Sequence, residues 1–475
     1  MRSDAAVEEP SVGSLLVPDR LAVWAWVLGY TALLTTLSVL RHQVWLATGF
    51  DLGMYEQGLW LIWHQGLLAA SSFTGHPLLG LQASYLLIPL SLVYHLGGVG
   101  ALLGIQAFSL GLGYLLLRNI AQGMGVPDRT AHIVGVAYLL FPVVLGSNLF
   151  DFHPVTLAVP MLLAAINAAL RGRPLPVGVW LALALLTQDT LVVPVLLLGL
   201  VLLIQGRSAS GGLAVLLAAV VAVVDGLVVL PHLGGPPAAD WHAAIRAAAG
   251  IPTGAWGQWV HSLRAWEYLV WIFGPVAGLL LLGWRRMLNL WWVPALAVVA
   301  VNLGQGTAAA TSPFNQWSLP AVAFMFAGLL AGLNGRQSMG RRWVWAAPMV
   351  MFLAVFGWHQ LRTNWHALPH NITALDTVVA KIPAGVPVVA QNFALAQVAN
   401  RDIALLPAEA LNKGLQARTY VLLEPAVTTG TTPAQTLAAL QARVKSLGKP
   451  VTVYDNGGTT LVRTQAKVPA EGGAT

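Results

Sequence analysis

The sequence predicts an α-helical multi-pass membrane protein with about eleven transmembrane helices, followed by a small C-terminal α/β domain. Of its 475 residues, 57% are hydrophobic and only 9% are charged, against the ~25% charged residues of an average soluble domain. Residues 21–358 hold about eleven apolar segments near the ~20 residues that a helix needs to cross a hydrocarbon core. After residue 358 the character changes, and all five lysines of the chain lie in that last part. A soluble globular protein is excluded.

The composition also excludes several kinds of site. The chain has no cysteine, so disulfides, thiolate metal sites and thiol nucleophiles are ruled out. The net charge of +7 does not indicate nucleic-acid binding, because the lysines are scattered and the arginines sit in short loops between apolar runs. The first apolar run, 21–40, is too long for a signal peptide and has no small-residue cleavage site, so we expect an uncleaved first crossing.

Arginines mark the loops on one side of the membrane. They fall in groups, and two apolar segments separate each group from the next, which returns the chain to the same side. The positive-inside rule makes that side the cytoplasm of an inner (cell) membrane. The alternate turns, and the segment after a last crossing at about 343–358, then lie outside. The ten arginines are Arg118, Arg129, Arg171, Arg173, Arg207, Arg285, Arg286, Arg336, Arg341 and Arg342.

The region before Arg118 admits two arrangements. If the N-terminus is cytoplasmic, 51–65 and 76–95 are juxtamembrane or re-entrant helices on the outer side, and 99–117 is the second crossing. If 76–95 crosses instead, the N-terminus is outside and Asp51 is inside. We favour the first arrangement, because 51–65 mixes acidic and amide side chains with tryptophans, as an interfacial amphipathic helix does.

The first arrangement gives four parts. They are a cytoplasmic N-terminal segment at 1–20, a transmembrane domain at 21–358, an extracytoplasmic α/β domain at 359–465 and a disordered tail at 466–475. About 100 residues suffice for one core, and we expect the α/β domain to dock on the outer face. Its expected elements are strands at 386–390, 403–405 and 418–423, helices at 394–399 and 433–446, and a hairpin at 451–462 that turns at Asn456-Gly457-Gly458.

Acidic side chains collect in the outer turns. Asp51, Asp151 and Asp189 each lie at the end of an apolar segment. An ionisable group at membrane depth costs at least ~2.5 kcal/mol on insertion scales and is a functional-site hypothesis by default. The alternative is that each carboxylate caps backbone N–H groups where water reaches it. Their convergence on one side, beside His76 and His153, favours a shared site.

The residues around Asp51 and the two histidines narrow that hypothesis. Tyr55 stands four residues after Asp51 and shares its helix face, whereas Glu56 is turned away, so these two acids are not an obvious carboxylate dyad. His76 and His153 each precede a proline, which keeps them out of a helix, and could carry protons, ligate a metal or contact phosphate. An Asp/His/Asp cluster would suit a divalent cation, but no HxxxH spacing exists, which leaves the metal unknown.

A long outer loop at 231–265 carries three tryptophans and two arginines. Aromatic rings at this depth ordinarily anchor a protein in the membrane interface. The sharper interpretation is a lid, in which Arg246 binds phosphate and the rings pack on an isoprenoid or a sugar.

Several segments together resemble a known family. Phe50-Asp51-Leu52-Gly53-Met54-Tyr55-Glu56-Gln57-Gly58-Leu59-Trp60, followed by His76-Pro77 and Gln106, resembles the FDLGxYxQxxW opening of the prokaryotic multi-pass membrane proteins of domain-of-unknown-function family 2079. Tyr138-Leu139-Leu140-Phe141-Pro142, Asp151-Phe152-His153-Pro154 and Gln188-Asp189 are similar to its later segments, in the same order. The resemblance covers most of residues 20–465. Gln188 departs from it, because the family tends to have lysine and glutamate there.

The resemblance implies a GT-C-like glycosyltransferase fold, with an acid in each of the first two outer loops. It implies inverting transfer of a sugar from a polyprenyl-phosphate-linked donor to an envelope acceptor at the extracytoplasmic face of the membrane. Asp51 would be the base or would orient the acceptor, and Asp151 is the second catalytic candidate. The candidates for substrate binding are the motif residues Tyr55, Glu56, Gln57, His76, His153, Gln188 and Asp189, together with Arg246 of the 231–265 loop.

Two other classes of function stay open. In a transporter or flippase, the same acids would carry protons or bind a polar or lipid-linked substrate, although such proteins usually have internal repeats and binding groups near the bilayer midplane. A non-catalytic envelope assembly protein would use its C-terminal domain for contacts and leave Asp51 silent.

Overall fold

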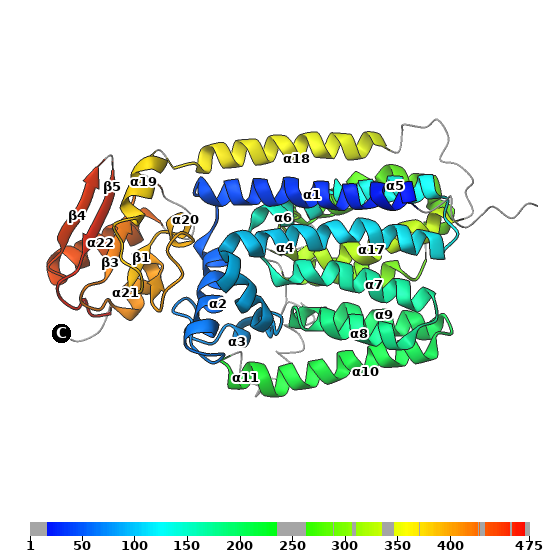
Figure 1. Cartoon of the computed structure of the whole chain (residues 1–475), viewed down its shortest axis with the longest axis horizontal. Helices are drawn as coiled ribbons and strands as arrows, with labels where there is room; N and C mark the ends of the chain where they lie inside the picture. The colour runs from blue at the N-terminus through cyan, green and yellow to red at the C-terminus, as the bar shows by residue number, and fades with distance from the viewer. Residues whose placement is uncertain are drawn as a thin grey trace, which may run out of the picture.

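A computed structural model describes residues 17–234, 263–287, 289–305, 310–334, 346–369, 371–425, 427, 433–456 and 458–470. Long helices lie roughly parallel in a bundle, and a small sheet domain lies at one end of it (Figure 1). We call that end the domain end. The loops after α4, α7 and α9 lie at the opposite end, which we call the arginine end because those loops or their flanks carry Arg118, Arg129, Arg171, Arg173 and Arg207.

Five helical segments of the described residues are long and apolar enough to cross a membrane, as expected of a multi-pass protein. They are Leu21–Gln43, Leu87–Gly123, Asp128–Phe150, Ser208–His232 and Gln316–Leu333, and shorter apolar helices cover Pro154–Leu170, Pro174–Leu185, Asp189–Ile204 and Trp292–Gln305. The helices of the bundle are α1 (Val17–Gln43), α4 (Leu87–Gly123), α5 (Asp128–Leu139), α6 (Pro142–Phe150), α7 (Ala158–Leu170), α8 (Pro174–Leu185), α9 (Val192–Ile204), α10 (Ser208–Val224), α11 (Leu230–His232), α14 (Leu263–Phe273), α15 (Ala277–Met287), α16 (Trp292–Gln305), α17 (Leu319–Leu333) and α18 (Ala346–Ala367).

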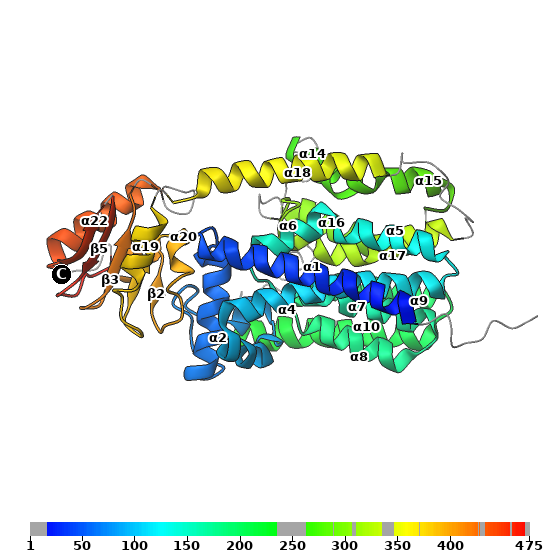
Figure 2. The ribbon, with the colours of Figure 1, turned by 45° about the horizontal axis from the view of Figure 1, so that its top comes forward.

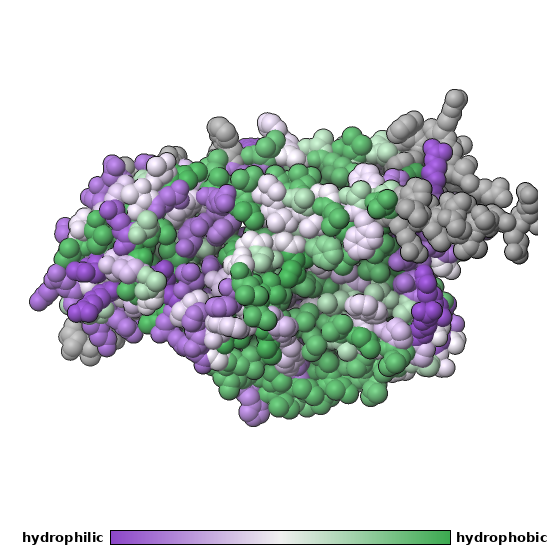
Figure 3. All heavy atoms as spheres, in the orientation of Figure 1, coloured by the Kyte–Doolittle hydropathy of each residue, from purple (hydrophilic) through white to green (hydrophobic). Residues whose placement is uncertain are grey.

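The position of each helix follows from which of its faces are apolar. Helix α17 is apolar all round and lies in the core of the bundle, where almost every residue is buried. Helix α10 exposes Leu216, Val220, Val223 and Val224 on the outside. In the space-filling view, apolar residues cover the middle of the molecule and polar ones gather at both ends (Figure 3). This is the surface of a protein that sits in a hydrocarbon layer.

Between α1 and the second crossing, the chain stays at the domain end. A π-helical turn, η1 (Gly49–Gly53), leads into α2 (Met54–His64), which runs across the ends of the bundle helices (Figures 1 and 2). Helix α4 is broken at Gly98, whose φ of 60° lies in the left-handed region that favours glycine. The break separates the first part of α4 from the segment that begins at residue 99, which is where the sequence predicts the start of the second crossing.

The expected juxtamembrane helix at 76–95 takes a different form. A short helix, α3 (Leu79–Gln82), is followed by Ala83 in the left-handed region and by residues 83–86 without a helix. Helix α4 then begins at Leu87 and runs through Gly98 to Gly123. The apolar pattern is continuous over this stretch, and hydropathy alone does not locate the two backbone breaks.

The C-terminal domain is a mixed five-stranded sheet with strand order β2-β1-β3-β5-β4. Strand β1 pairs in parallel with β2 and β3, while β5 pairs antiparallel with β3 and β4. The expected strands, the helix near 433–446 and the hairpin are present, whereas the helix expected at 394–399 lies at 392–395, and α19 and α21 are additional helices. Residues 466–470 differ from the expected disorder, because Val468 forms a bridge with Leu415. The elements are α19 (Ile372–Val379), β1 (Val388–Ala390), α20 (Asn392–Leu395), β2 (Ala404–Leu405), α21 (Pro407–Lys413), β3 (Tyr420–Leu423), α22 (Ala434–Leu447), β4 (Val451–Asn456) and β5 (Thr459–Arg463).

The C-terminal domain packs directly on η1 and α2. One buried hydrophobic cluster includes Leu52 and Leu59 from this region and Leu395 and Leu406 from the domain. A Cβ atom added to Gly49 would lie 2.7 Å from the Cβ of Leu395, which explains why a glycine stands there. The sheet domain and the loop that carries Asp51 therefore form a continuous packed unit.

Candidate functional site

Asp51 lies in the η1 turn at the domain end. One of its carboxylate oxygens, Oδ1, is 3.3 Å from Nε2 of His153, and Oδ2 accepts a hydrogen bond of 3.2 Å from the Thr48 hydroxyl. The Thr48 side chain also caps η1 by accepting from the Asp51 N–H. The Asp51 side chain is 23% exposed, so it remains accessible to a molecule that approaches from the domain end.

Asp151 lies beside Asp51 but faces inward, because its side chain is only 2% exposed. Its Oδ2 accepts hydrogen bonds from the Thr48 N–H at 3.0 Å and hydroxyl at 2.8 Å, and its Oδ1 is 3.6 Å from an Arg41 guanidinium nitrogen. Arg41 also donates to the carbonyls of Leu149 and Phe150. The hollow beside Arg41 and Asp151 measures only about 10 Å³, about what a single water needs. Asp151 therefore has its partners within the protein.

Gln106 of α4 holds the backbone of the second outer loop. Its amide donates to the carbonyls of Asn148 and Asp151, and its Oε1 accepts from the His153 N–H at 2.9 Å. Gln106 has no exposed surface. The His153 ring lies between two acceptors, the Asp51 carboxylate at Nε2 and the Asp151 carbonyl at Nδ1, 3.3 Å away. We call Arg41, Thr48, Asp51, Asp151 and His153 the Asp51 cluster.

The pKa values of the two carboxylates of the cluster are shifted in opposite directions. Burial raises the pKa of Asp51, but the hydrogen bond and charge of His153, with Thr48 and Arg41, outweigh burial and leave that pKa below its usual range. Burial raises the pKa of Asp151 to about 6; the charge of Arg41 lowers it only in part, and the nearby charge of Asp51 adds to the rise. Asp51 is therefore the carboxylate that stays ionised under mildly acidic conditions.

A second acidic group lies along the same end of the bundle. The Tyr55 ring packs edge-on against His153, and its hydroxyl donates to Gln82 at 3.0 Å. Beyond Gln82, the Tyr85 hydroxyl donates to Asp225, which begins a π-helical turn, η4 (Asp225–Val229). Asp189, in the turn η3 (Asp189–Leu191), interacts electrostatically with Asp225. Asp51 and Asp189 both act on Tyr55 electrostatically.

Glu56 and Gln57 face the C-terminal domain and bond to none of the Asp51 cluster residues. Glu56 is buried, accepts a hydrogen bond of 2.9 Å from the Tyr94 hydroxyl and interacts with the buried Arg401. The Gln57 amide donates to the carbonyls of Arg401 and Asp402. These two residues, which the resemblance places in substrate binding, connect α2 to the C-terminal domain in the structure.

Glu56 should make the stability of this connection depend on pH. Burial raises its pKa from 4.5 to about 7, while the Tyr94 hydrogen bond and the Arg401 charge lower it only in part. The folded state therefore favours the protonated form, and this contribution to stability is present below pH 4.5 and lost as the pH rises through about 7. We expect the thermal unfolding midpoint of the wild type to fall across this interval relative to that of Glu56→Gln. Thermal unfolding in detergent over a pH series measures it.

The exposed Glu267 provides the control for this series. Glu267→Gln should follow the wild type at every pH. Parallel curves for the wild type and Glu56→Gln would contradict the assigned role of Glu56.

The remaining predicted site residues lie elsewhere or outside the described residues. His76 is exposed and its ring packs over Gly234, just after α11. Gln188 is buried in the turn before Asp189. Arg246 and most of the 231–265 loop lie outside the described residues. Within the described part of the chain, no three His, Asp or Glu side chains are arranged to hold a metal ion.

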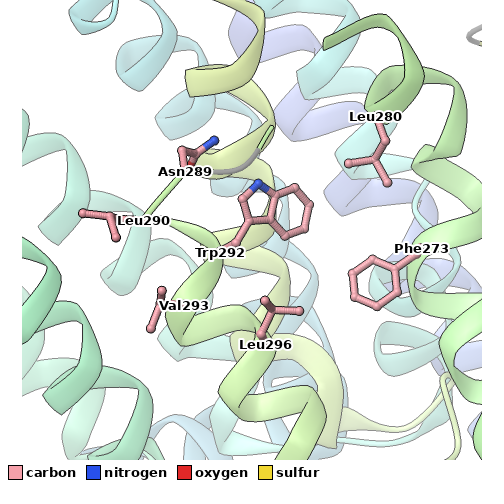
Figure 4. A pocket seen from close by; sticks show the side chains of 7 residues that line it. All are labelled: Phe273, Leu280, Asn289, Leu290, Trp292, Val293 and Leu296. Atoms are coloured by element: carbon pink, nitrogen blue, oxygen red, sulfur yellow. The ribbon is translucent and has the colours of Figure 1, made fainter. Parts of the chain in front are cut away.

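A separate apolar pocket of about 480 Å³ lies between α14, α15 and α16. Its walls are Phe273, Leu280, Leu290, Trp292, Val293 and Leu296, with Asn289 as the polar member (Figure 4). Asn289 donates to the carbonyls of Arg286 and Gly328, which ties this pocket to the loop between α15 and α16. It has none of the acidic residues described above and is not part of the candidate site.

Two residues of the Asp51 cluster were not selected from the sequence. Arg41 ends the first apolar run, and an arginine at that depth needs a polar or acidic partner. Its position in the sequence could therefore have marked it as a site residue. Thr48 stands three residues before Asp51, the spacing of a capping residue. That both bind Asp151 depends on the packing of α1 against α6, which the local sequence does not reveal.

Comparisons with known proteins agree with this architecture. The model of the family DUF2079, described as a predicted membrane protein, matches residues 41–445. ArnT from Cupriavidus metallidurans bound to undecaprenyl phosphate has a similar structure, with a TM-score of 0.58 and 13% identity over 94% of this chain and 99% of that one. ArnT from the same organism in the apo state gives a TM-score of 0.52 and 14% identity over 92% and 98%. No curated protein matches the chain. The match confirms the expected GT-C-like fold.

Proposed function

We propose that this chain, which belongs to the DUF2079 family of predicted membrane proteins, transfers a sugar from a polyprenyl-phosphate-linked donor to an acceptor of the cell envelope. The observation that carries the proposal is the Asp51 cluster, in which the ionised Asp51 carboxylate is partly exposed while Asp151 and His153 are buried. Two further observations support it. The fold is shared with ArnT, and one of the ArnT structures holds undecaprenyl phosphate.

In the proposed reaction, Asp51 is the general base. Its carboxylate takes the proton from an acceptor hydroxyl or amine while that atom attacks the anomeric carbon of the sugar from the face opposite the lipid phosphate. The bond between the anomeric carbon and the phosphate oxygen breaks, and its electron pair leaves with the polyprenyl phosphate. No nucleotide is needed, because the lipid phosphate is itself the leaving group.

The other residues take distinct parts in this proposal. Asp151 is a positioning residue, since it fixes Thr48 and Arg41 and has almost no exposed surface. His153 holds the Asp51 carboxylate in its ionised form. Tyr55, Gln188 and Asp189 would supply polar contacts to the sugar. His76 and Arg246 would stabilise the charge that develops on the departing phosphate.

We place this site on the extracytoplasmic side of the inner membrane. The arginine end would face the cytoplasm by the positive-inside rule, together with the N-terminus, and the domain end would face outward. The C-terminal domain, which packs on η1 and α2, would then stand beside the site and bind or position the envelope acceptor.

The test is donor cleavage by the purified full chain in lipid vesicles. Supplied with polyprenyl-phosphate sugars and with envelope lipids or polysaccharide as acceptors, the chain should release free polyprenyl phosphate in amounts equal to the sugar transferred. Movement of intact donor across the vesicle membrane without cleavage would overturn the proposal in favour of a transporter or flippase. If no donor is either cleaved or moved across the membrane, an assembly protein becomes the better explanation.

A further inference from the structure

A group of imidazole and indole rings lies on α2 and the first part of α4, away from the Asp51 cluster. Its members surround a pocket of about 260 Å³, and we call them the histidine–tryptophan cage: Trp60, Trp63, His64, Tyr94, His95 and Gly98. The pocket is smaller than the ~300–1,000 Å³ of typical small-molecule sites. Trp60 follows Asp51 by nine residues, roughly 13 Å along a helix. No hydrogen bond or ring contact joins the cage to that cluster among the described residues.

The rings of the cage are held in fixed orientations. His64 stacks on Trp60 with ring centres 4.2 Å apart, and His95 stacks on Trp63 at 4.3 Å. The two imidazoles meet edge to face at 6.4 Å. The left-handed backbone at Gly98 ends this part of α4 beside the pocket. Each imidazole therefore lies on an indole face.

Polar atoms of these rings are available to a ligand. His64 uses Nδ1 for a 2.8 Å contact with the Trp60 carbonyl. Its Nε2, and both ring nitrogens of His95, make no hydrogen bond within the described residues. Both imidazoles are exposed. The pocket walls include no acid, and Glu56 lies behind the ring of Tyr94, to whose hydroxyl it is bonded. Because the carbonyl of Trp60 accepts from His64, the ring left to donate is that of His95, and no carboxylate of the pocket wall competes with an anion for its N–H.

The surroundings indicate which anion. Helix α2 lies across the end of the bundle, at the edge of the apolar band (Figures 1 and 3). Leu92 and Leu96, on either side of His95 in the sequence, are 47% and 77% exposed, and Trp63 is 44% exposed. An apolar rim beside an imidazole donor at the edge of the apolar band matches a molecule with alkyl chains and a phosphate.

We propose that the histidine–tryptophan cage binds the phosphate group of a membrane lipid at a site separate from the Asp51 cluster. His95 donates to a phosphate oxygen, the His64 ring forms part of the pocket wall, and the lipid chains lie along Leu92 and Leu96. This inference goes beyond the proposed transfer reaction and does not depend on it, because none of the cage residues takes part in that chemistry.

The test measures retention of phosphatidylglycerol by the purified full chain in native mass spectrometry. A double variant, His64→Gln with His95→Gln, should hold this lipid about tenfold more weakly than the wild type. His232→Gln is the matched control, because His232 is also exposed and makes the same Nδ1 contact, with the carbonyl of Val228, but lies in no cage. It should leave retention unchanged, and diacylglycerol with the same chains should not be retained.

Inorganic phosphate distinguishes the two sources of the anion. Displacement of the lipid by phosphate alone would show that the cage recognises the free group, and failure to displace it would show that the lipid chains are needed; either result supports a phosphate site. Equal retention by the wild type and the double variant, or equal binding of diacylglycerol, would overturn the proposal. If the double variant does not fold, His95→Gln gives the same test, since His95 has no side-chain hydrogen bond among the described residues to lose.

Discussion

Replacing Asp51 by asparagine should lower the rate of sugar transfer by about 10²–10⁴-fold, the usual contribution of a positioned general base. Asparagine has nearly the same shape and can still accept the Thr48 hydrogen bond, but it cannot take a proton from the acceptor. Binding of the lipid-linked donor should therefore change little while the turnover number falls. Initial rates and donor affinity, measured on the same reconstituted preparation, separate the two effects.

The control for this substitution is Asp128→Asn. Asp128 lies at the start of α5 with its side chain 66% exposed, and it pairs with Arg118 rather than with any residue of the Asp51 cluster. Its replacement should leave transfer unchanged. An Asp51→Asn protein that transfers sugar at the wild-type rate would show that this carboxylate is not the base.

Replacing Arg41 by methionine should destabilise the fold by about 3–5 kcal/mol at neutral to alkaline pH, the typical cost of removing one partner of a buried ion pair. Asp151 would keep its charge with only the Thr48 hydrogen bonds to compensate for burial. Arg41 lowers the pKa of Asp151, which is about 6 in the intact cluster, so its loss raises that pKa further. The cost should therefore shrink as the pH falls and Asp151 takes up a proton.

Unfolding midpoints of the single and double variants measure this effect. Adding Asp151→Asn to Arg41→Met should recover most of the lost stability, because no buried charge remains. Asp128→Asn, which breaks an exposed pair, should cost only about 0–1 kcal/mol. Additive losses for Arg41→Met and Asp151→Asn would contradict the pairing.

Much of the membrane architecture follows from residue patterns. The start of the second crossing was predicted at residue 99, and the chain breaks at Gly98 because only a glycine adopts that backbone conformation readily. The strands of the C-terminal domain follow from short β-branched and aliphatic runs. The prediction of one helix at 76–95 was wrong, because an unbroken apolar pattern conceals the turn at residues 83–86.

The site was predictable in its residue types and less so in its connections. Acids and histidines near segment ends indicated a polar cluster, and Asp51, Asp151 and His153 do lie together. Asp151 is the inaccessible acid because it is buried against its partners, and one of these, Arg41, comes from a helix far away in the sequence. Glu56 meets Arg401 of the C-terminal domain for the same reason. Local periodicity gives no information about such long-range contacts.

Transfer at the extracytoplasmic face requires that the Asp51 site faces the outside of the cell. The chain has no native cysteine, so single cysteines can be placed at exposed positions and probed in intact cells with a membrane-impermeant thiol reagent. Phe50, His76 and Ala408 lie at the domain end or in the C-terminal domain, and Gln122 and Gln205 lie at the arginine end. The account predicts that the first three label in intact cells and that the last two label only after permeabilisation. The reverse pattern would place Asp51 and the C-terminal domain in the cytoplasm and contradict transfer at the extracytoplasmic face.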